Sequence, residues 1–386
     1  MKLTQAISSK RDISPFYVME VMAKADKLEA EGQQICHLEV GELDFQTPKE
    51  IQESTIEALQ SGAQNYTHTL GNNVLRQAIA TKFLQEDIVV EIEQILVSTG
   101  TSPILFMVLA AVLDAGDEVI LFDPGYPCYA NFAKLLNIKI RTVKLKAEDG
   151  FRPNPNSLRQ AIGPRTKAII LCSPANPTGV VLTPEELEKL ADLGCWLIVD
   201  EIYRSIEYGC EPVPSSLKLN RPNIIIVDGF SKKYAMTGYR LGYGIFPRIL
   251  KQKIQVIHQN LMISANPFVQ AGGITALTHP QVELTRQVWL KELQKRRAVL
   301  MSGLDVLGIN IFAKPEGAFY LLADFRWTGK KSLTLADEIL DQCGVALTPG
   351  IDFGTQAEGF LRFSFSKSVP IIEKALTRLN QWIKVQ

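Results

Sequence analysis

One stretch decides the fold: Asp228-Gly229-Phe230-Ser231-Lys232-Lys233-Tyr234-Ala235-Met236-Thr237-Gly238-Tyr239-Arg240-Leu241-Gly242-Tyr243. It follows Ile224-Ile225-Ile226-Val227, a β-branched run that predicts a buried parallel strand. Lys232 is therefore expected in the loop beyond the carboxyl end of a strand. Open α/β sheets bind their ligands at this edge.

Two side chains of this loop suggest a ligand. A lysine amine carried into such a crevice, as at Lys232, loses its proton readily and forms a Schiff base with a carbonyl. Eight positions on, Arg240 offers a planar fork suited to phosphate. An aldehyde and a phosphate together suggest pyridoxal phosphate. A solvated basic turn, with two lysines and an arginine, is the alternative that these residues alone leave open.

The same spacing carries a family resemblance. Ser231-Lys232, five further residues and then Gly-x-Arg-x-Gly-Tyr resemble the lysine signature of the class I and II aminotransferases, the fold-type I enzymes that use pyridoxal phosphate. The resemblance implies that Ser231 and Arg240 bind the cofactor and that Lys232 holds its aldehyde. Three positions before the lysine, some relatives carry a phosphate-binding serine or threonine, whereas this chain has Gly229.

The composition is that of a globular protein that works on small molecules. The 386 residues are enough for two packed domains, and 46% of them are hydrophobic and 21% charged. Lysine plus arginine number 41, as do aspartate plus glutamate, so no overall field attracts nucleic acid or an anionic membrane. We therefore expect neither nucleic acid nor membrane as a partner.

The cysteines favour a reducing compartment and no metal site. They lie far apart without a CxxC pair, at Cys36, Cys128, Cys172, Cys195, Cys210 and Cys343. Such spacing suits reduced thiols and gives no zinc framework. Residues 1–11 lack an apolar secretion core, and the longest apolar run, residues 103–113, is too short to span a bilayer. The sequence therefore predicts a cytoplasmic protein.

The first segments suggest a helix and a pocket glycine. Ser14 to Gly32 is typical of a helix capped by Ser14. After it, Gly41-Glu42-Leu43-Asp44-Phe45 is by itself only a turn signal. It resembles the family segment Gly-Glu-Pro-Asp-Phe, which implies that Gly41 lines the substrate pocket, although Leu43 replaces the proline.

A tyrosine motif implies a dimer. Tyr66 opens a segment that ends at Gly71, and a loop tyrosine is usually just half-buried packing. The segment matches the family's Tyr-Thr-x-x-x-Gly, whose tyrosine reaches the cofactor phosphate of the neighbouring subunit. The resemblance therefore implies a homodimer with shared active sites. Without a side chain at Gly229, phosphate binding would rest more heavily on Tyr66, Ser102, Ser231 and Arg240.

The segment after Ile95-Leu96-Val97 predicts an anion site at a helix start. Ser98-Thr99-Gly100-Thr101-Ser102-Pro103 supplies capping residues and a starting proline before an apolar helix. Free N–H groups at such a start bind anions. A capped core helix with nothing bound is the alternative. In the family the equivalent turn holds the cofactor phosphate, at positions that match Gly100, Thr101 and Ser102.

Two strand ends carry further motif residues. Val119 to Phe122 predicts a strand that leads into Asp123-Pro124-Gly125-Tyr126, whose ring could stack on a heterocycle or simply pack in the core. The family's stacking aromatic falls on Tyr126. After the predicted strand at residues 168–172, Ser173-Pro174-Ala175-Asn176-Pro177-Thr178-Gly179 matches a specific family signature. The resemblance implies that Asn176 contacts the phenolic oxygen of the cofactor and lies beside the substrate.

An acid closes the next predicted strand. Asp200 follows Trp196-Leu197-Ile198-Val199, and a buried acid is costly unless it pairs with a cation such as a protonated pyridine nitrogen. The alternative is that Asp200 caps a helix. Tyr203 matches the family tyrosine that also bonds the phenolic oxygen.

An arginine lies in an apolar strand near the carboxyl end. Leu361-Arg362-Phe363-Ser364-Phe365-Ser366 alternates as a strand does, and a buried guanidinium calls for a carboxylate partner. Arg362 matches the family arginine that holds the α-carboxylate of the amino acid. An arginine facing solvent from an edge strand is the alternative.

These residues predict a fold and a function. Strands alternate with helices from about residue 46 to 280, which indicates a mixed, largely parallel α/β sheet. The resemblance implies a fold-type I transferase, with a large cofactor domain at 46–280 and a smaller α/β domain from 1–45 and 281–386. It implies ping-pong transamination between an L-amino acid and a 2-oxo acid, with Lys232, Asp200 and Tyr203 catalytic.

Three alternatives stay open from the sequence. A carbon-sulfur β-lyase on the same fold would share every motif. A non-catalytic regulator that binds the cofactor is a second, against which the chain shows no appended DNA-binding domain. A metabolite-binding α/β protein without the cofactor is the third. The preferred amino acid is not readable, since no motif identifies the second cation that an aspartate-specific site needs.

Overall fold

A computed structural model describes residues 13–209 and 213–386 of the chain. The predictions made for residues 1–11 and for Cys210 therefore lie outside the described residues. Within the described part, none of the helices combines the length and apolar character needed to cross a bilayer.

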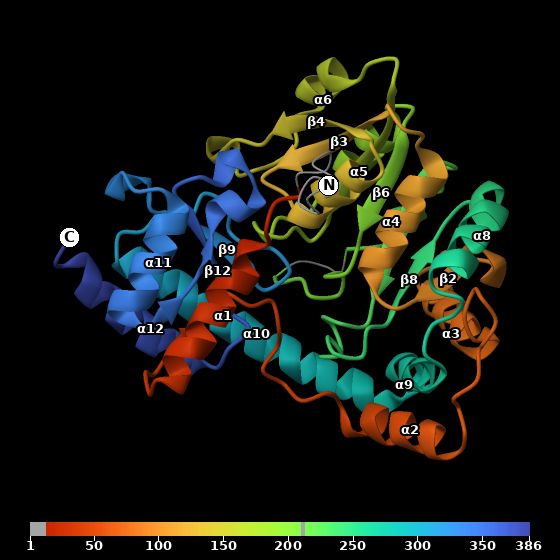
Figure 1. Ribbon diagram of the computed structural model, residues 1–386, viewed down its shortest axis with the longest axis horizontal. Helices are drawn as coiled ribbons and strands as arrows, with labels where there is room; N and C mark the ends of the chain where they lie inside the picture. Colours follow the sequence, from red (N-terminus) through yellow and green to blue (C-terminus); the bar gives the residue numbers. More distant parts are fainter. Residues whose placement is uncertain (1–12, 210–212) are drawn as a thin grey trace, which may run out of the picture.

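A seven-stranded sheet forms the centre of the larger part (Figure 1). Its strands, in the order β2-β8-β7-β6-β5-β3-β4, are β2 (Ile95–Ser98), β8 (Gly242–Ile245), β7 (Ile224–Gly229), β6 (Trp196–Asp200), β5 (Thr166–Cys172), β3 (Glu118–Asp123) and β4 (Lys139–Lys144). The pairs from β7 through β4 are parallel, whereas β8 is antiparallel to both of its neighbours. The predicted mixed, largely parallel α/β sheet is confirmed.

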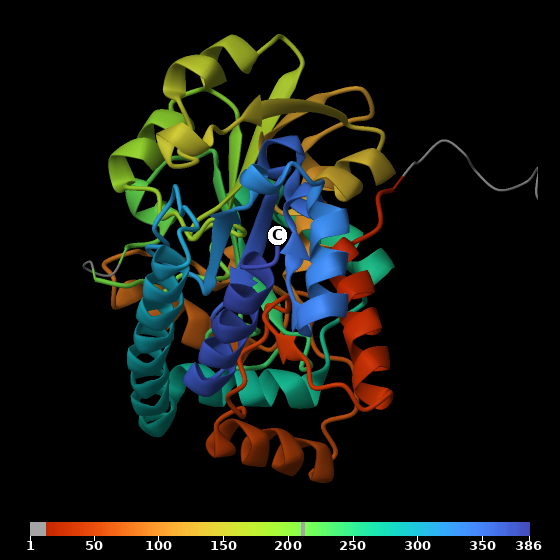
Figure 2. The same ribbon diagram turned by 90° about the vertical axis from the view of Figure 1, so that its left-hand side faces the viewer.

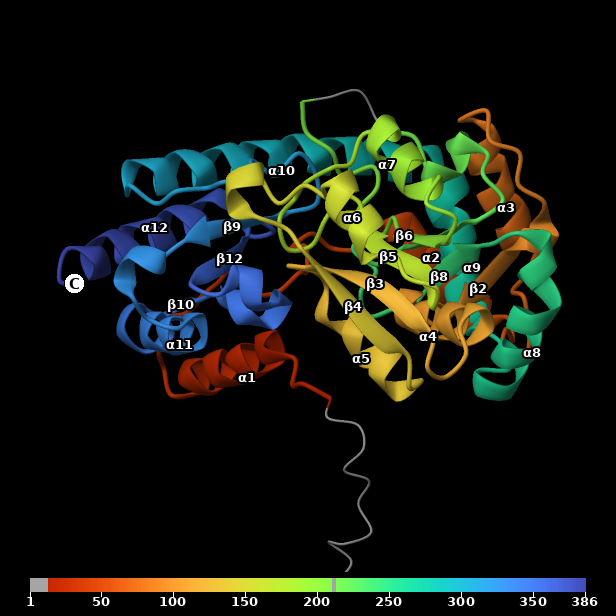
Figure 3. The same cartoon turned by 90° about the horizontal axis from the view of Figure 1, so that it is seen from above.

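Helices cover both faces of this sheet because its strands alternate their side chains. In β7, Ile224 and Ile226 join one core and Ile225 and Val227 the other. One face packs against α4 (Thr101–Val112), α5 (Pro127–Leu135) and α8 (Lys251–Leu261). The other packs against α2 (Lys49–Gln60), α3 (Asn73–Leu84), α6 (Pro155–Ala161), α7 (Pro184–Ala191) and α9 (Pro267–Thr278). In Figure 3, α4 and α5 lie on the opposite side of the strands from α6 and α7.

Two small sheets organise the remaining elements. β11 (Thr348–Pro349), β12 (Phe360–Ser364) and β9 (Tyr320–Asp324) form an antiparallel sheet with β12 in the centre. β1 (Cys36–His37) pairs in parallel with β10 (Val345–Ala346), so an amino-terminal strand completes a carboxyl-terminal unit. The surrounding helices, seen together in Figure 2, are α1 (Tyr17–Ala30), α10 (Pro280–Val306), α11 (Ser332–Cys343) and α12 (Val369–Ile383).

The long helix α10 connects the two parts. It contacts α9 and α2 near its start and α12 farther along, as Figure 1 shows. α10 thus bridges the part built on the large sheet and the part built on the small sheets.

Two helix starts differ from the sequence expectation. α1 begins at Tyr17 rather than after Ser14, because the buried Asp352 carboxylate accepts the N–H groups of Tyr17 and Val18, at 3.1 and 3.3 Å. This distant carboxylate caps the helix in place of a local serine. At α4 the N-cap is Gly100, with φ of 98°, and no side chain caps the first turn. The first N–H groups of α4 are thus left for another partner.

Candidate active site

The cavity that holds the motif residues opens at the carboxyl edge of the large sheet. Asp200 ends β6, Asn176 follows β5 and Lys232 follows β7, so the parallel strands deliver all three side chains to one edge. The cavity measures about 210 Å³. The predicted residues in its lining are Gly41, Thr101, Tyr126, Asn176, Asp200, Tyr203, Lys232 and Arg362. Gly100, Ser102, Ser231, Arg240 and Tyr66 are not part of this lining, although Gly100 lies against Arg240 beside the lining residue Thr101.

Lys232 presents its amine to the cavity. Its Nζ donates to the carbonyl oxygen of Gly41 at 2.8 Å. Burial lowers the pKa of Lys232 to about 8, and the neighbouring carboxylate of Glu42 opposes that shift. A lysine with a lowered pKa spends more of its time as the free amine that attacks carbonyls.

The adjacent lysine is committed elsewhere. The ammonium group of Lys233 lies 2.6 Å from the carboxylate of Asp228, and both side chains are buried. The same carboxylate oxygen accepts the Tyr243 hydroxyl at 2.7 Å. The two neighbouring lysines therefore point to different partners.

Asp200 is a buried acid without a cation. It is only 4% exposed, and it accepts the Tyr129 hydroxyl at 2.8 Å and the N–H of Ile202 at 3.2 Å. Burial raises its pKa to about 7, against the opposing effect of these hydrogen bonds. Among residues 13–209 and 213–386, none of the ion pairs includes Asp200. No helix begins after it, so the helix-cap interpretation is wrong.

Arg362 is buried in the central strand of the small sheet, which rules out the solvent-facing alternative. Its Nη1 donates to the Asn176 side-chain oxygen at 3.0 Å, and its Nη2 donates to the Thr348 hydroxyl at 3.0 Å and to the carbonyl of Glu39. Within the described ranges its Nε has no hydrogen-bond partner. Neutral oxygens surround a full positive charge, an arrangement suited to receiving an anion.

A second anion-binding arrangement lies at the start of α4. A Cβ on Gly100 would stand 2.6 Å from Nη2 of Arg240, so the guanidinium lies directly against the glycine backbone. Gly242 is equally close, since its own Cβ would lie 2.8 Å from the backbone nitrogen of Thr101. Arginine, free helix N–H groups and glycines that leave room for them together form a cradle for a phosphate.

Close packing explains why residue 229 is a glycine. A Cβ there would lie 3.1 Å from Gly242 Cα and from the Leu241 carbonyl, and 3.2 Å from Ile202. A serine or threonine at this position would therefore displace a neighbour. The departure from some relatives follows from the tight packing of β7 against β8.

Aromatic side chains complete the walls. The hydroxyls of Tyr203 and Tyr320 lie 3.0 Å apart, and the Tyr126 ring meets the Tyr129 ring edge-on at 5.3 Å between centroids. Tyr66, in contrast, is 79% exposed and contributes nothing to the cavity of its own chain.

Two tyrosines of the site were not predicted from the sequence. Tyr129 donates its hydroxyl to Asp200 from the first turn of α5, three residues after Tyr126. Tyr320 packs its ring 4.3 Å from the Arg362 guanidinium carbon, and a Cβ on Gly41 would collide with its hydroxyl. Both tyrosines lie beside recognised motifs, but no local pattern indicates what their hydroxyls contact.

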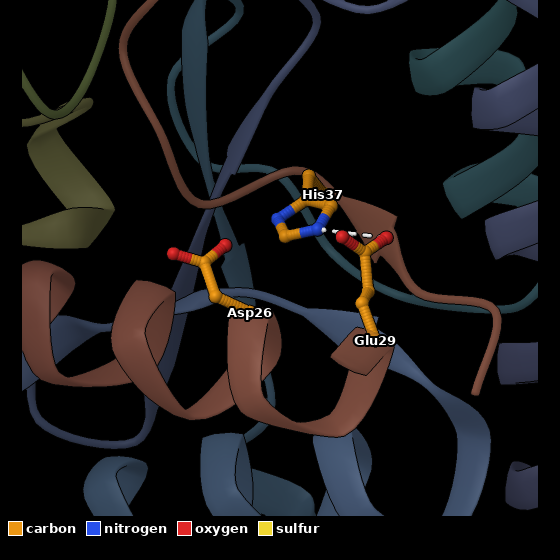
Figure 4. Close-up of side chains that lie close together, drawn as sticks. All are labelled: Asp26, Glu29 and His37. Carbon is orange, nitrogen blue, oxygen red and sulfur yellow. Dashed lines mark ion pairs between the residues drawn. The ribbon is translucent and has the colours of Figure 1, made fainter. Parts of the chain in front are cut away.

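A group of three ionisable side chains lies close together outside the cavity. Asp26 and Glu29 of α1 approach His37, as Figure 4 shows. The ring nitrogens of His37 face two carboxylates, Nε2 at 3.3 Å from Glu29 and Nδ1 at 2.8 Å from the buried Glu39. The hydrogen bond that the Glu39 carboxylate accepts raises the pKa of His37. The placement of His37 is therefore explained by its pairs with Glu29 and Glu39.

Comparison with known proteins decides the family. The sequence model described as "Aminotransferase class I and II" matches residues 33–379. The chain belongs to the class I and II aminotransferases. This aminotransferase is 33% identical to the valine–pyruvate aminotransferase of Mycobacterium tuberculosis, over the whole length of both chains. It is 34% identical to the aspartate/prephenate aminotransferase of Thermus thermophilus, covering 95% of each.

Solved structures agree. An aminotransferase from Mycobacterium tuberculosis superposes with a TM-score of 0.94 and 32% identity, covering 98% of this chain and 99% of the other. The aspartate aminotransferase of Thermus thermophilus with maleate gives a TM-score of 0.91 and 33% identity, covering 99% and 98%. The predicted fold-type I architecture is confirmed, and these relatives favour transamination over the β-lyase and regulator alternatives.

The chain is therefore a pyridoxal-phosphate-dependent transaminase, and its cavity fits that cofactor. An amine of lowered pKa suits the aldehyde, and a buried carboxylate without a cation suits the pyridine nitrogen. The glycine-lined start of α4 beside Arg240 suits the phosphate. Lys232, Asp200 and Thr101 at the start of α4 all line one cavity, so a single flat ligand can contact all three.

Proposed function

We propose that Lys232, Asp200 and Arg362 are the residues through which this aminotransferase moves an amino group between an L-amino acid and a 2-oxo acid by a ping-pong mechanism. One observation carries the proposal. All three side chains line the same cavity, and across the described ranges none is in an ion pair. Each charge is thus left for a cofactor or substrate group of opposite charge.

Pyridoxal phosphate, when bound, supplies an aldehyde that condenses with amines and a ring that accepts the electron pair left at the substrate Cα. Lys232 is the proposed proton carrier, because its amine would be the base that takes the proton from the substrate Cα and passes it on within the site. Asp200 would hold the pyridine nitrogen in its protonated form, whose positive charge would draw electrons from the reacting bond.

The proposed substrate contacts come from three elements. Arg362 binds the α-carboxylate through its fork, and Asn176, which already accepts from its Nη1, keeps that fork in place. Gly41 also lines the cavity, and the absence of a side chain there leaves room for the Tyr320 hydroxyl. Asn176 and Tyr203 are also the proposed ligands of the phenolic oxygen, and Tyr126 the residue that stacks on the ring.

The proposed phosphate site combines one subunit with its neighbour. Gly100, Thr101 and Ser102 offer the start of α4, while Ser231 and Arg240 come from the lysine loop. Tyr66 of a second copy would complete it, in a homodimer with shared active sites. Its 79% exposure supports this proposal, as do the exposed apolar side chains of Ile56, Leu59 and Val74 on the neighbouring helices α2 and α3.

We also propose the domain division that the sequence suggests, with residues 46–280 forming the cofactor domain and residues 1–45 and 281–386 the smaller one. The pairing of β1 with β10 supports it. A cytoplasmic location is proposed as well, supported by the free state of Cys36, Cys128, Cys172, Cys195 and Cys343.

The test separates transamination from its rivals. Holoenzyme mixed with an amino acid alone should convert its cofactor once, seen as a loss of the visible absorbance band, and a 2-oxo acid should restore that band. A carbon-sulfur β-lyase would instead release pyruvate and ammonia from S-substituted cysteine continuously, without a 2-oxo acid. A regulator that only binds the cofactor would show neither behaviour.

A further inference from the structure

One part of the cavity lining is apolar. Its wall is made by Phe16, Val18 and Met19, at the start of α1, and by Val40 in the segment after β1. Val18 is buried, Phe16 and Val40 are half-buried, and Met19 is exposed, so the wall runs from the interior to the mouth. The hydrogen bonds from Asp352 to the first turn of α1 fix its deeper part.

The charges in the lining are few and already assigned. Among the described residues of the lining, the cations are Lys232 and Arg362, and the carboxylates are Asp200 and Glu42. On the proposed function, Lys232 acts as the base at the substrate Cα and Arg362 binds the α-carboxylate. The described lining that this chain itself supplies then offers a side-chain carboxylate no cation, only apolar carbon and the exposed Glu42.

We infer that this aminotransferase selects amino acids with neutral, apolar side chains over the dicarboxylic amino acids aspartate and glutamate. The inference rests on the proposed function, since it places the α-carboxylate on Arg362. A substrate anchored there and at Lys232 turns its side chain toward the wall of Phe16, Val18, Met19 and Val40. An apolar side chain gains contact there, whereas a carboxylate would lose water without gaining a partner.

Physical magnitudes give the size of the expected selectivity. One methylene group in an apolar pocket changes kcat/KM by roughly 10- to 200-fold, and an unpaired buried charge is penalised more heavily. The wall is partly open at Met19, which moderates that penalty. We therefore expect valine, leucine or methionine to exceed aspartate and glutamate by at least about tenfold in kcat/KM.

The primary experiment ranks substrates for the purified holoenzyme. The first half-reaction is followed by cofactor absorbance with valine, leucine, methionine, aspartate and glutamate, so the choice of 2-oxo acid does not enter. An apolar amino acid leading both acidic ones by about tenfold or more supports the inference. A smaller ratio, or an acidic amino acid in the lead, overturns it while leaving transamination intact. Cofactor that stays unconverted with every amino acid would instead contradict the proposed function.

A second test introduces a positive charge at Val40, a residue of the wall that is only half-buried. Val40→Lys adds a cation there, and Val40→Met is the control of similar length without charge. Relative to Val40→Met, Val40→Lys should raise the aspartate-to-valine ratio of kcat/KM by at least about tenfold. An equal ratio in the two variants would show that substrate side chains do not face this wall. Should Val40→Lys not fold, the ranking of the unmodified enzyme decides alone.

Discussion

Arg362 and Asn176 are joined by a hydrogen bond of 3.0 Å between Nη1 and the side-chain oxygen. Arg362 belongs to β12 in the small three-stranded sheet, whereas Asn176 lies in the loop after β5 of the large sheet. This bond therefore fixes the proposed carboxylate site relative to the strand edge that carries Lys232 and Asp200. A displacement of one sheet against the other would alter the alignment of substrate and cofactor.

We predict that Arg362→Lys impairs the reaction without removing the cofactor. Lysine keeps the charge but loses the fork that meets a carboxylate and contacts Asn176 and Thr348. The loss of transition-state binding should be about 2–5 kcal/mol, measured as kcat/KM. Arg240→Lys is the matched control, because it should weaken cofactor affinity instead. Unchanged kcat/KM for every α-amino acid would remove Arg362 from the substrate site.

Asp200 should make the stability of the cofactor-free protein depend on pH. Burial raises its pKa from 3.8 to about 7, so the folded chain keeps a proton that the unfolded chain releases near pH 4. The stabilisation is fully present below pH 4 and is lost as the pH rises to about 7, by up to about 4 kcal/mol. Urea unfolding between pH 4.5 and 7.5 should show a larger loss in the parent protein than in Asp200→Asn, in which the buried carboxyls of Glu207 and Asp352, with pKa values raised to about 7 and about 6, still titrate. Identical pH profiles for the two proteins would contradict the assignment.

Tyr66→Phe should weaken cofactor retention. Removing one hydroxyl that bonds a charged phosphate costs about 1.5–3 kcal/mol, and the exposed position of Tyr66 predicts little effect on folding. Equilibrium dialysis measures the cofactor affinity, and thermal unfolding of the cofactor-free variant serves as the control for stability. A fully active monomer in sedimentation would disprove the shared site.

Much of the fold was predictable because its local signals agree. The β-branched run before the lysine loop forms β7, and Thr183 and Glu186 form the capping box at the start of α7 that the chain suggests by itself. The common location of Asp200 and Lys232 was predictable because each follows a strand, and parallel strands bring their carboxyl ends to one edge of the sheet.

The remaining features depend on distant contacts that no local pattern encodes. The start of α1 is set by Asp352, which lies more than three hundred residues away along the chain. Tyr129 meets Asp200 only because β3 and β6 are close in the folded sheet. Arg362 was expected in an alternating strand, yet every residue of β12 is buried, because the strand lies between two others and beneath helices.

Borohydride reduction of the holoenzyme, followed by peptide mass analysis, identifies the lysine that carries the cofactor. We predict the cofactor on Lys232 and none on Lys233, whose ammonium group is held by Asp228 at 2.6 Å. Lys232→Ala should still bind cofactor through Arg240 and the start of α4, but its turnover should fall by at least about 10²- to 10⁴-fold. Label on Lys233, or near-normal turnover of Lys232→Ala, would contradict the account.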